Sequence, residues 1–160
     1  MSDAAPASAM LRLVLDTNVW LDWLVFDDPA TAPIKAAVAA GTAGVFIDAA
    51  CGEELERVLA YPRRRNTLDA AAQSACLAEC LRVARATGAF TPAQAATATL
   101  PLCSDADDQK FLELARDCGA DVLVTRDHAL LDLARSRNRR PPFRILTPRQ
   151  FDEALRDASA

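Results

Sequence analysis

The sequence has one histidine, and its five cysteines include no Cys-x-x-Cys pair. An odd cysteine count without paired spacing argues against a disulfide framework, and a single histidine leaves a tetrahedral zinc site short of ligands. Cys76 and Cys80 stand one helical turn apart, but we interpret the cysteines as small core residues in a reducing cytoplasm. No apolar run approaches the ~20 residues that a membrane span requires, so no membrane partner is predicted.

An excess of positive charge is also lacking, since the net charge is −4 and the pI is about 5.0. This excludes a generic nucleic-acid coat, because affinity for phosphates rests on Lys and Arg. Two basic clusters nevertheless occur, and they comprise Arg63, Arg64 and Arg65, and Arg135, Arg137, Arg139, Arg140 and Arg144. They are either solvated surface or flanks that attract a polyanion towards an acidic centre.

The length of 160 residues suits one globular domain with a sizeable core. We expect a flexible tail over residues 1–10, which is Ala-rich and lacks the features of a secretory signal, and a single domain over residues 11–158. Short apolar runs predict strands at 11–15, 44–47, 122–124 and 143–146. Helical spacing predicts helices between them, including a long Ala-rich helix at 68–86, whereas 90–103 shows no firm period. This alternation predicts an α/β fold with a parallel sheet covered on both faces.

Four acidic residues follow apolar runs or stand in the opening turn of a predicted helix. Asp16 ends the first strand, Asp127 follows the strand at 122–124, and Glu54 and Asp108 stand in first helical turns. Ligand-binding groups of an open parallel sheet gather at the carboxyl ends of its strands. Four carboxylates there would repel one another unless a hard divalent cation neutralised them. The pattern therefore predicts a phosphodiesterase site that uses Mg²⁺ or Mn²⁺.

Each acid also has a purely structural interpretation. Asp105, Asp108 and Asp127 stand where carboxylates cap helix amides, and Asp105 is the best candidate for such a cap. Asp108 is set apart by its spacing to the apolar face of its helix. Asp16 is the hardest to explain structurally, because a carboxylate after a buried strand is costly without a partner.

Segments 13–19, 54–59, 105–112, 124–131 and 145–151 together resemble the PIN-domain ribonucleases, especially the bacterial, VapC-like branch of toxin components from toxin–antitoxin pairs. The resemblance spans Leu11 to about Leu155. It implies a three-layer α/β/α sandwich with a central parallel sheet, and endonuclease action on RNA. It also implies partners: an RNA substrate, a small antitoxin protein and a second copy of the chain in a homodimer.

Carried over residue by residue, the resemblance implies that the catalytic, metal-binding acids are Asp16, Glu54, Asp108 and Asp127. Supporting roles fall to Asn18, Thr125 and Asp105, and nucleic-acid contacts to Arg63, Arg64, Arg65 and Arg126. The Mg²⁺ or Mn²⁺ ion would activate water and stabilise charge on the scissile phosphate.

Three alternatives stay open. The first is a phosphatase or phospho-accepting receiver domain, although the segment after Asp16 lacks the second aspartate of haloacid-dehalogenase-type phosphatases. The second is a PIN-like binding module without turnover. The third is a nuclease that acts on single-stranded or flap DNA.

Overall fold

The computed structural model describes residues 9–86, 99–138 and 140–160. The predicted tail therefore lies almost wholly outside the described residues, as do Arg139 and most of the stretch 90–103. None of the helices in the described ranges is long and apolar enough to cross a membrane.

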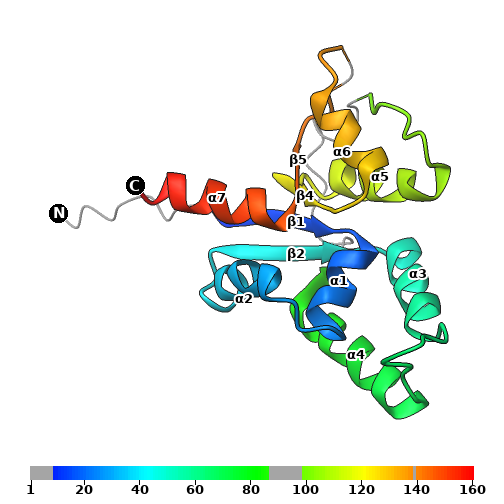
Figure 1. Cartoon of the computed structure of the whole chain (residues 1–160). Coiled ribbons are helices and arrows are strands. Elements are labelled where there is room, and N and C mark those ends of the chain that lie inside the picture. The colour runs from blue at the N-terminus through cyan, green and yellow to red at the C-terminus, as the bar shows by residue number, and fades with distance from the viewer. Residues whose placement is uncertain (1–8, 87–98, 139) are drawn as a thin grey trace.

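Five strands form a parallel sheet in the order β3-β2-β1-β4-β5 (Figure 1). They are β1 (Leu11–Leu15), β2 (Ala43–Ile47), β3 (Ala84–Ala86), β4 (Val122–Val124) and β5 (Arg144–Leu146). The inner strands read as continuous apolar runs because both of their faces are covered. Leu13, Val14 and Leu15 of β1 are accordingly buried, as are all three residues of β4.

Seven helices of the described chain flank the sheet. They are α1 (Thr17–Leu24), α2 (Ala32–Ala39), α3 (Ala49–Leu59), α4 (Ala70–Val83), α5 (Gln109–Asp117), α6 (His128–Arg135) and α7 (Pro148–Ala158). Two 3₁₀ turns, η1 (Pro29–Thr31) and η2 (Ala106–Asp108), precede α2 and α5. Helices α1 and α2 pack on β1 and β2, whereas α5 packs on β1 and β4. The predicted α/β/α sandwich with a central parallel sheet is confirmed.

Two local predictions were wrong. The predicted helix at 68–86 ends at Val83, and its last three residues form β3, which pairs with residues 45–47 of β2. Helix α3 begins at Ala49, because the Asp48 side chain accepts a hydrogen bond from the Cys51 amide. Glu54 therefore lies in the second turn of its helix, not in the first.

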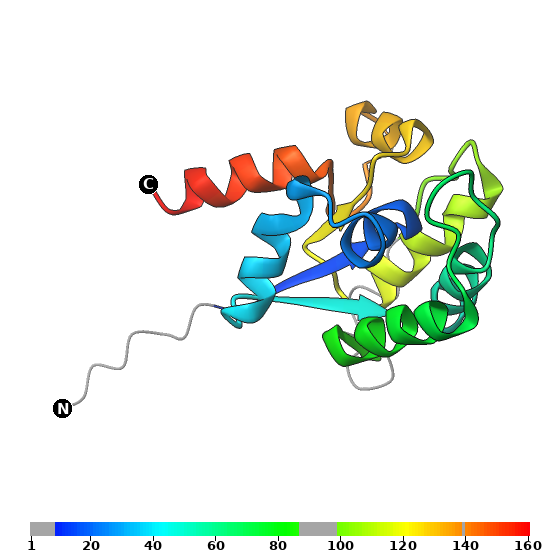
Figure 2. The same cartoon turned by 60° about the horizontal axis from the view of Figure 1, so that its bottom comes forward.

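The strand order places a topological switch point between β1 and β4. From β1 the chain moves outward through β2 to β3, and it then returns to the other side of β1 to form β4 and β5. Open parallel sheets bind ligands outside the carboxyl ends of the strands at such a point. Figure 2 shows β2 pointing towards the side of the molecule where α3 lies, which identifies that edge of the sheet.

Candidate functional site

Asp16 lies at the carboxyl end of β1, directly before α1. The residue is 3% exposed, and its Oδ2 accepts a 2.7 Å hydrogen bond from the Thr125 hydroxyl. Burial raises the pKa of Asp16, and the charges of Asp127 and Glu54 raise it further, against the opposing hydrogen bonds from Thr125 and the Thr17 backbone. The energetic balance therefore disfavours the charged form of a carboxylate that the fold has fixed in place.

Asp108 ends the 3₁₀ turn that leads into α5. Its Oδ2 is buried, and the residues that the structure describes provide no hydrogen-bond partner for it. Burial raises the pKa of Asp108 to about 7, with further contributions from the charges of Asp127, Asp16 and Asp105 and a hydrogen bond with Asp127. Asp108 and Asp16 thus face the same group of negative charges.

Asp127 follows β4 and caps α6. Its Oδ1 accepts a 2.8 Å hydrogen bond from the Ala129 amide, as the structural interpretation predicted. Its own amide donates to Thr125 Oγ1 over 2.9 Å. Since the Thr125 hydroxyl also donates to Asp16, one buried threonine connects the ends of the two strands at the switch point. The capping role does not remove Asp127 from the site, because its charge acts on both Asp16 and Asp108.

Glu54 is held by two partners that the sequence analysis did not assign to the site. The Thr17 hydroxyl donates to its Oε2. The ammonium group of Lys110 donates to its Oε1 over 2.7 Å, in an ion pair whose side chains are only 21% and 15% exposed. Thr17 could have been suspected from its position directly after Asp16. No local sequence pattern indicates the ion pair between Lys110 and Glu54, because the two residues are 56 positions apart.

The other predicted supporting residues differ in their placement. Thr125 makes the hydrogen bond to Asp16 described above. Asp105 caps the 3₁₀ turn by accepting from the Asp107 amide, as expected, and its charge also acts on Asp108. Asn18 is exposed on α1, and no hydrogen bond within the described ranges links it to the four acids, so its supporting role remains a prediction.

The predicted nucleic-acid-binding arginines are in part engaged elsewhere. Arg63 donates to the carbonyls of Val58, Tyr61 and Leu59 at the end of α3. Arg126 makes ion pairs of 3.1 Å with Asp22 and 3.2 Å with Asp28, and so connects the segment after β4 to α1 and to the segment that follows α1. Arg64 and Arg65 are exposed, and their contact with a nucleic acid remains a prediction.

The described residues do not form a ready-made metal centre, because no three His, Cys, Asp or Glu side chains among them are grouped to hold an ion. Glu54 accepts hydrogen bonds from Lys110 and Thr17, and Asp127 accepts one from the Ala129 amide. The donor set nevertheless fits a hard divalent cation. It consists of carboxylates, one of which has a buried oxygen with no partner in the described ranges, and burial together with neighbouring negative charge raises the pKa of Asp16 and of Asp108.

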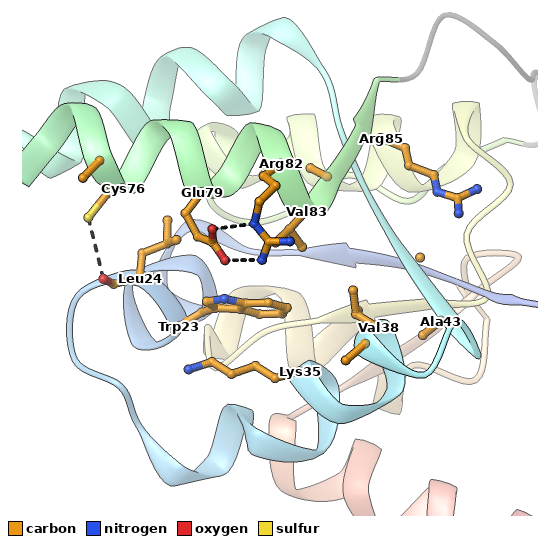
Figure 3. A pocket seen from close by; sticks show the side chains of 15 residues that line it. Trp23, Leu24, Lys35, Val38, Ala43, Cys76, Glu79, Arg82, Val83 and Arg85 are labelled. Carbon is orange, nitrogen blue, oxygen red and sulfur yellow. Dashed lines mark hydrogen bonds and ion pairs between the residues drawn. The ribbon is translucent and has the colours of Figure 1, made fainter.

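A large cavity of about 870 Å³ lies elsewhere and includes none of the four acids. It lies between α1, α2, β2 and α4, with the Trp23 ring next to Lys35 and an ion pair between Glu79 and Arg82 (Figure 3). Three large aromatic residues, Trp20, Trp23 and Phe26, lie on α1 or directly after it. Trp20 is buried, Trp23 lines the cavity and Phe26 is exposed, so the three do not share one surface.

Comparison with known protein families places this geometry in context. The family model described as PIN domain matches residues 12–129, which is most of the chain, and the chain therefore belongs to the PIN-domain family. Members of this family are generally nucleases, that is, hydrolases, and they generally use divalent metal ions. A search of curated proteins found no match. The family identified from the sequence is confirmed at this level.

Proposed function

We propose that the protein is a metal-dependent endoribonuclease whose active site is the edge of the sheet at the switch point. The observation that supports this most directly is the group of Asp16, Asp108 and Asp127. Burial raises the pKa of Asp16 and of Asp108, the charge of Asp127 raises both further, and the main charges acting on Asp108 are all negative. Carboxylates that repel one another at this edge of the sheet favour the binding of a cation, because the cation relieves the repulsion.

In this proposal Asp16 and Asp108 bind Mg²⁺ or Mn²⁺ directly, and Asp127 and Glu54 bind directly or through water. The cation supplies Lewis-acid stabilisation of charge on the scissile phosphate and activation of the attacking water. The protein's contribution is orientation: Thr125 fixes Asp16, and the Ala129 amide fixes Asp127. Proper placement of such groups accounts for much of the rate enhancement of phosphoryl-transfer enzymes.

The test is cleavage of tRNA and of an unstructured RNA with Mn²⁺, for the wild type and for Asp16→Asn. We expect cleavage that EDTA abolishes and that falls at least about a hundredfold in the variant, because Asp16 is held rigidly where no other group replaces it. Asp132→Asn, which changes an exposed acid on α6, is the matched control and should keep full activity. Cleavage that persists in EDTA or in Asp16→Asn refutes the proposal.

Two further arms distinguish the alternatives. Cleavage of single-stranded or flap DNA in preference to RNA would identify a DNA nuclease with the same metal chemistry. Mn²⁺ binding by calorimetry without cleavage of any substrate would identify a binding module.

The resemblance to toxin components also supports a small antitoxin as partner and a homodimer. A gene for a small protein directly upstream, whose product co-purifies with this chain and suppresses cleavage, would support the assignment. Its absence, together with no growth defect on expression, would contradict it.

A further inference from the structure

Lys110 is a cation placed inside an otherwise acidic site. Its ammonium group donates to Glu54 Oε1 over 2.7 Å and to the Asp107 carbonyl over 2.5 Å. An ammonium group has three donors. Among the described residues these two oxygens are the hydrogen-bond acceptors of its nitrogen, so one N–H is left without an acceptor there.

The ion pair lies beside the three aspartates without neutralising them. The charge of Glu54 raises the pKa of Asp16, and Thr17, which holds the other oxygen of Glu54, directly follows Asp16. The main charges acting on Asp108, in contrast, are those of Asp127, Asp16 and Asp105. The acids are therefore of two kinds: three repelling aspartates, and a glutamate whose two oxygens are already occupied.

A nucleic-acid strand that approaches this edge meets strong repulsion from the aspartates. A cation at the aspartates offsets part of it for the reacting phosphate, but each neighbouring phosphate also needs a positive partner. Arg126 is engaged by Asp22 and Asp28. Lys110 is held in place, is partly shielded from water, and keeps a donor. A lysine binds phosphate as a compact point charge.

We infer that Lys110, anchored by Glu54 and the Asp107 carbonyl, binds a backbone phosphate of the nucleic-acid substrate next to the aspartates. This inference rests on the proposed function and sharpens it, because Glu54 then acts mainly as the anchor of Lys110. Lys110 and Lys35 are the only two lysines among 18 basic residues.

Lys35 provides a closely matched control. It also pairs with a carboxylate, Asp27, over 2.8 Å, and it also lies over an aromatic ring, that of Trp23, at 5.7 Å. The corresponding distance from Lys110 to the Phe111 ring is 5.3 Å. Lys35 lines the cavity of Figure 3, which contains none of the four acids. Lys35→Met therefore removes the same charge from a lysine–carboxylate pair away from the proposed site, one whose carboxylate is more exposed.

The experiment measures binding of a short fluorescein-labelled single-stranded RNA by anisotropy in Ca²⁺, across a series of salt concentrations, for the full chain. We expect Lys110→Met to weaken binding about tenfold and to lower the slope of log K against log salt by about 0.7, the change for one lost phosphate contact on a single strand. Lys110→Arg should restore most of the slope, and Lys35→Met should leave both quantities unchanged. An unchanged slope in Lys110→Met, or an equal loss in Lys35→Met, overturns the inference.

Removal of Lys110 alone leaves Glu54 without its partner, which can destabilise the fold. The double variant Lys110→Met/Glu54→Gln removes both charges and should show the same loss of slope. Mn²⁺ affinity, measured by calorimetry, should stay within about threefold of the wild type in Lys110→Met, which keeps all four acids. A tenfold gain in Mn²⁺ affinity would mean that Lys110 only blocks Glu54 from binding the ion, which also overturns the inference. Failure of the proposed function is seen separately, as absence of Mn²⁺-dependent cleavage by the wild type.

Discussion

Asp108→Asn is expected to stabilise the metal-free protein at pH 8 while it weakens metal binding. At this pH Asp108 is charged although its Oδ2 is buried without a partner and faces Asp127 and Asp16. A carboxyl whose pKa moves from 3.8 to about 7 disfavours its charged form in the folded state by roughly 4 kcal/mol. Solvent screening at the open edge of the sheet reduces the net effect to about 1–2 kcal/mol.

The sign of the pH dependence follows from proton binding. Between pH 4 and pH 7 the folded protein holds a proton on Asp108 that the unfolded chain has released. Stability therefore falls as the pH rises through this window, and the penalty is fully present above the folded-state pKa. The neutral amide of Asp108→Asn carries no such penalty, so the difference between variant and wild type should be largest at pH 8, about half as large or less at pH 5, and absent only below the unfolded-state pKa of 3.8.

The assay is thermal unfolding in EDTA at both pH values. A gain of about 1–2 kcal/mol corresponds to roughly 2–8 °C for a chain of this size. Asp132→Asn serves as the surface control and should stay within about 0.5 kcal/mol of the wild type. With Mn²⁺ present the order should reverse, because the ion stabilises only the protein that binds it. A variant less stable than the wild type at pH 8 in EDTA, or equally stabilised at both pH values, would refute the reasoning.

Three other substitutions or treatments test the supporting contacts. Thr125→Val removes the hydroxyl that serves both Asp16 and Asp127, and urea unfolding should show a loss of about 1–3 kcal/mol; an unchanged midpoint would contradict this. Arg126→Gln leaves the partly buried Asp22, whose pKa burial already raises, without its counter-charge, so a loss of about 1 kcal/mol is expected at pH 7. Burial raises the pKa of Cys51, and raises those of Cys80 and Cys118 to about 11. A thiol reagent at pH 8 should therefore label at most Cys76 and Cys103 in the native protein, and rapid labelling of all five would show that the core is open.

The sequence is sufficient to predict those parts of the fold that depend on local patterns. Strands β1 and β4 are recognisable because burial on both faces demands continuous apolar runs, and the rule for parallel sheets then brings Asp16 and Asp127 together. Strand β3 is not recognisable. Its residues, Ala84, Arg85 and Ala86, carry no β-branched or aromatic side chain and continue the composition of the preceding helix, so only pairing with β2 defines them.

Contacts between distant residues explain what the sequence could not predict in the site. The start of α3 depends on the Asp48 cap, which changes the position of Glu54 within its helix by one turn. The partners of Glu54 and Arg126 come from other elements: Lys110 is 56 residues from Glu54, and Asp28 is 98 residues from Arg126. The spacing of residues along the sequence carries no information about such pairs. These ion pairs determine which charges of the site are balanced by an opposite charge.

The carboxylates of Asp16 and Glu54 each accept a hydrogen bond from a threonine hydroxyl, and an uncharged donor affects the charge of the site differently from a cation. Thr125 fixes Asp16, and Thr17 fixes Glu54, each through a hydroxyl on a short side chain with restricted rotation. An arginine in the place of Thr125 would orient Asp16 equally well, but it would also neutralise the aspartate and lower its affinity for a cation. A hydroxyl orients the carboxylate and does not add a neutralising charge, so the repulsion that the proposed divalent cation would relieve is kept. Lys110 is therefore tolerated only because its charge is matched by Glu54, one to one, at the margin of the aspartate group.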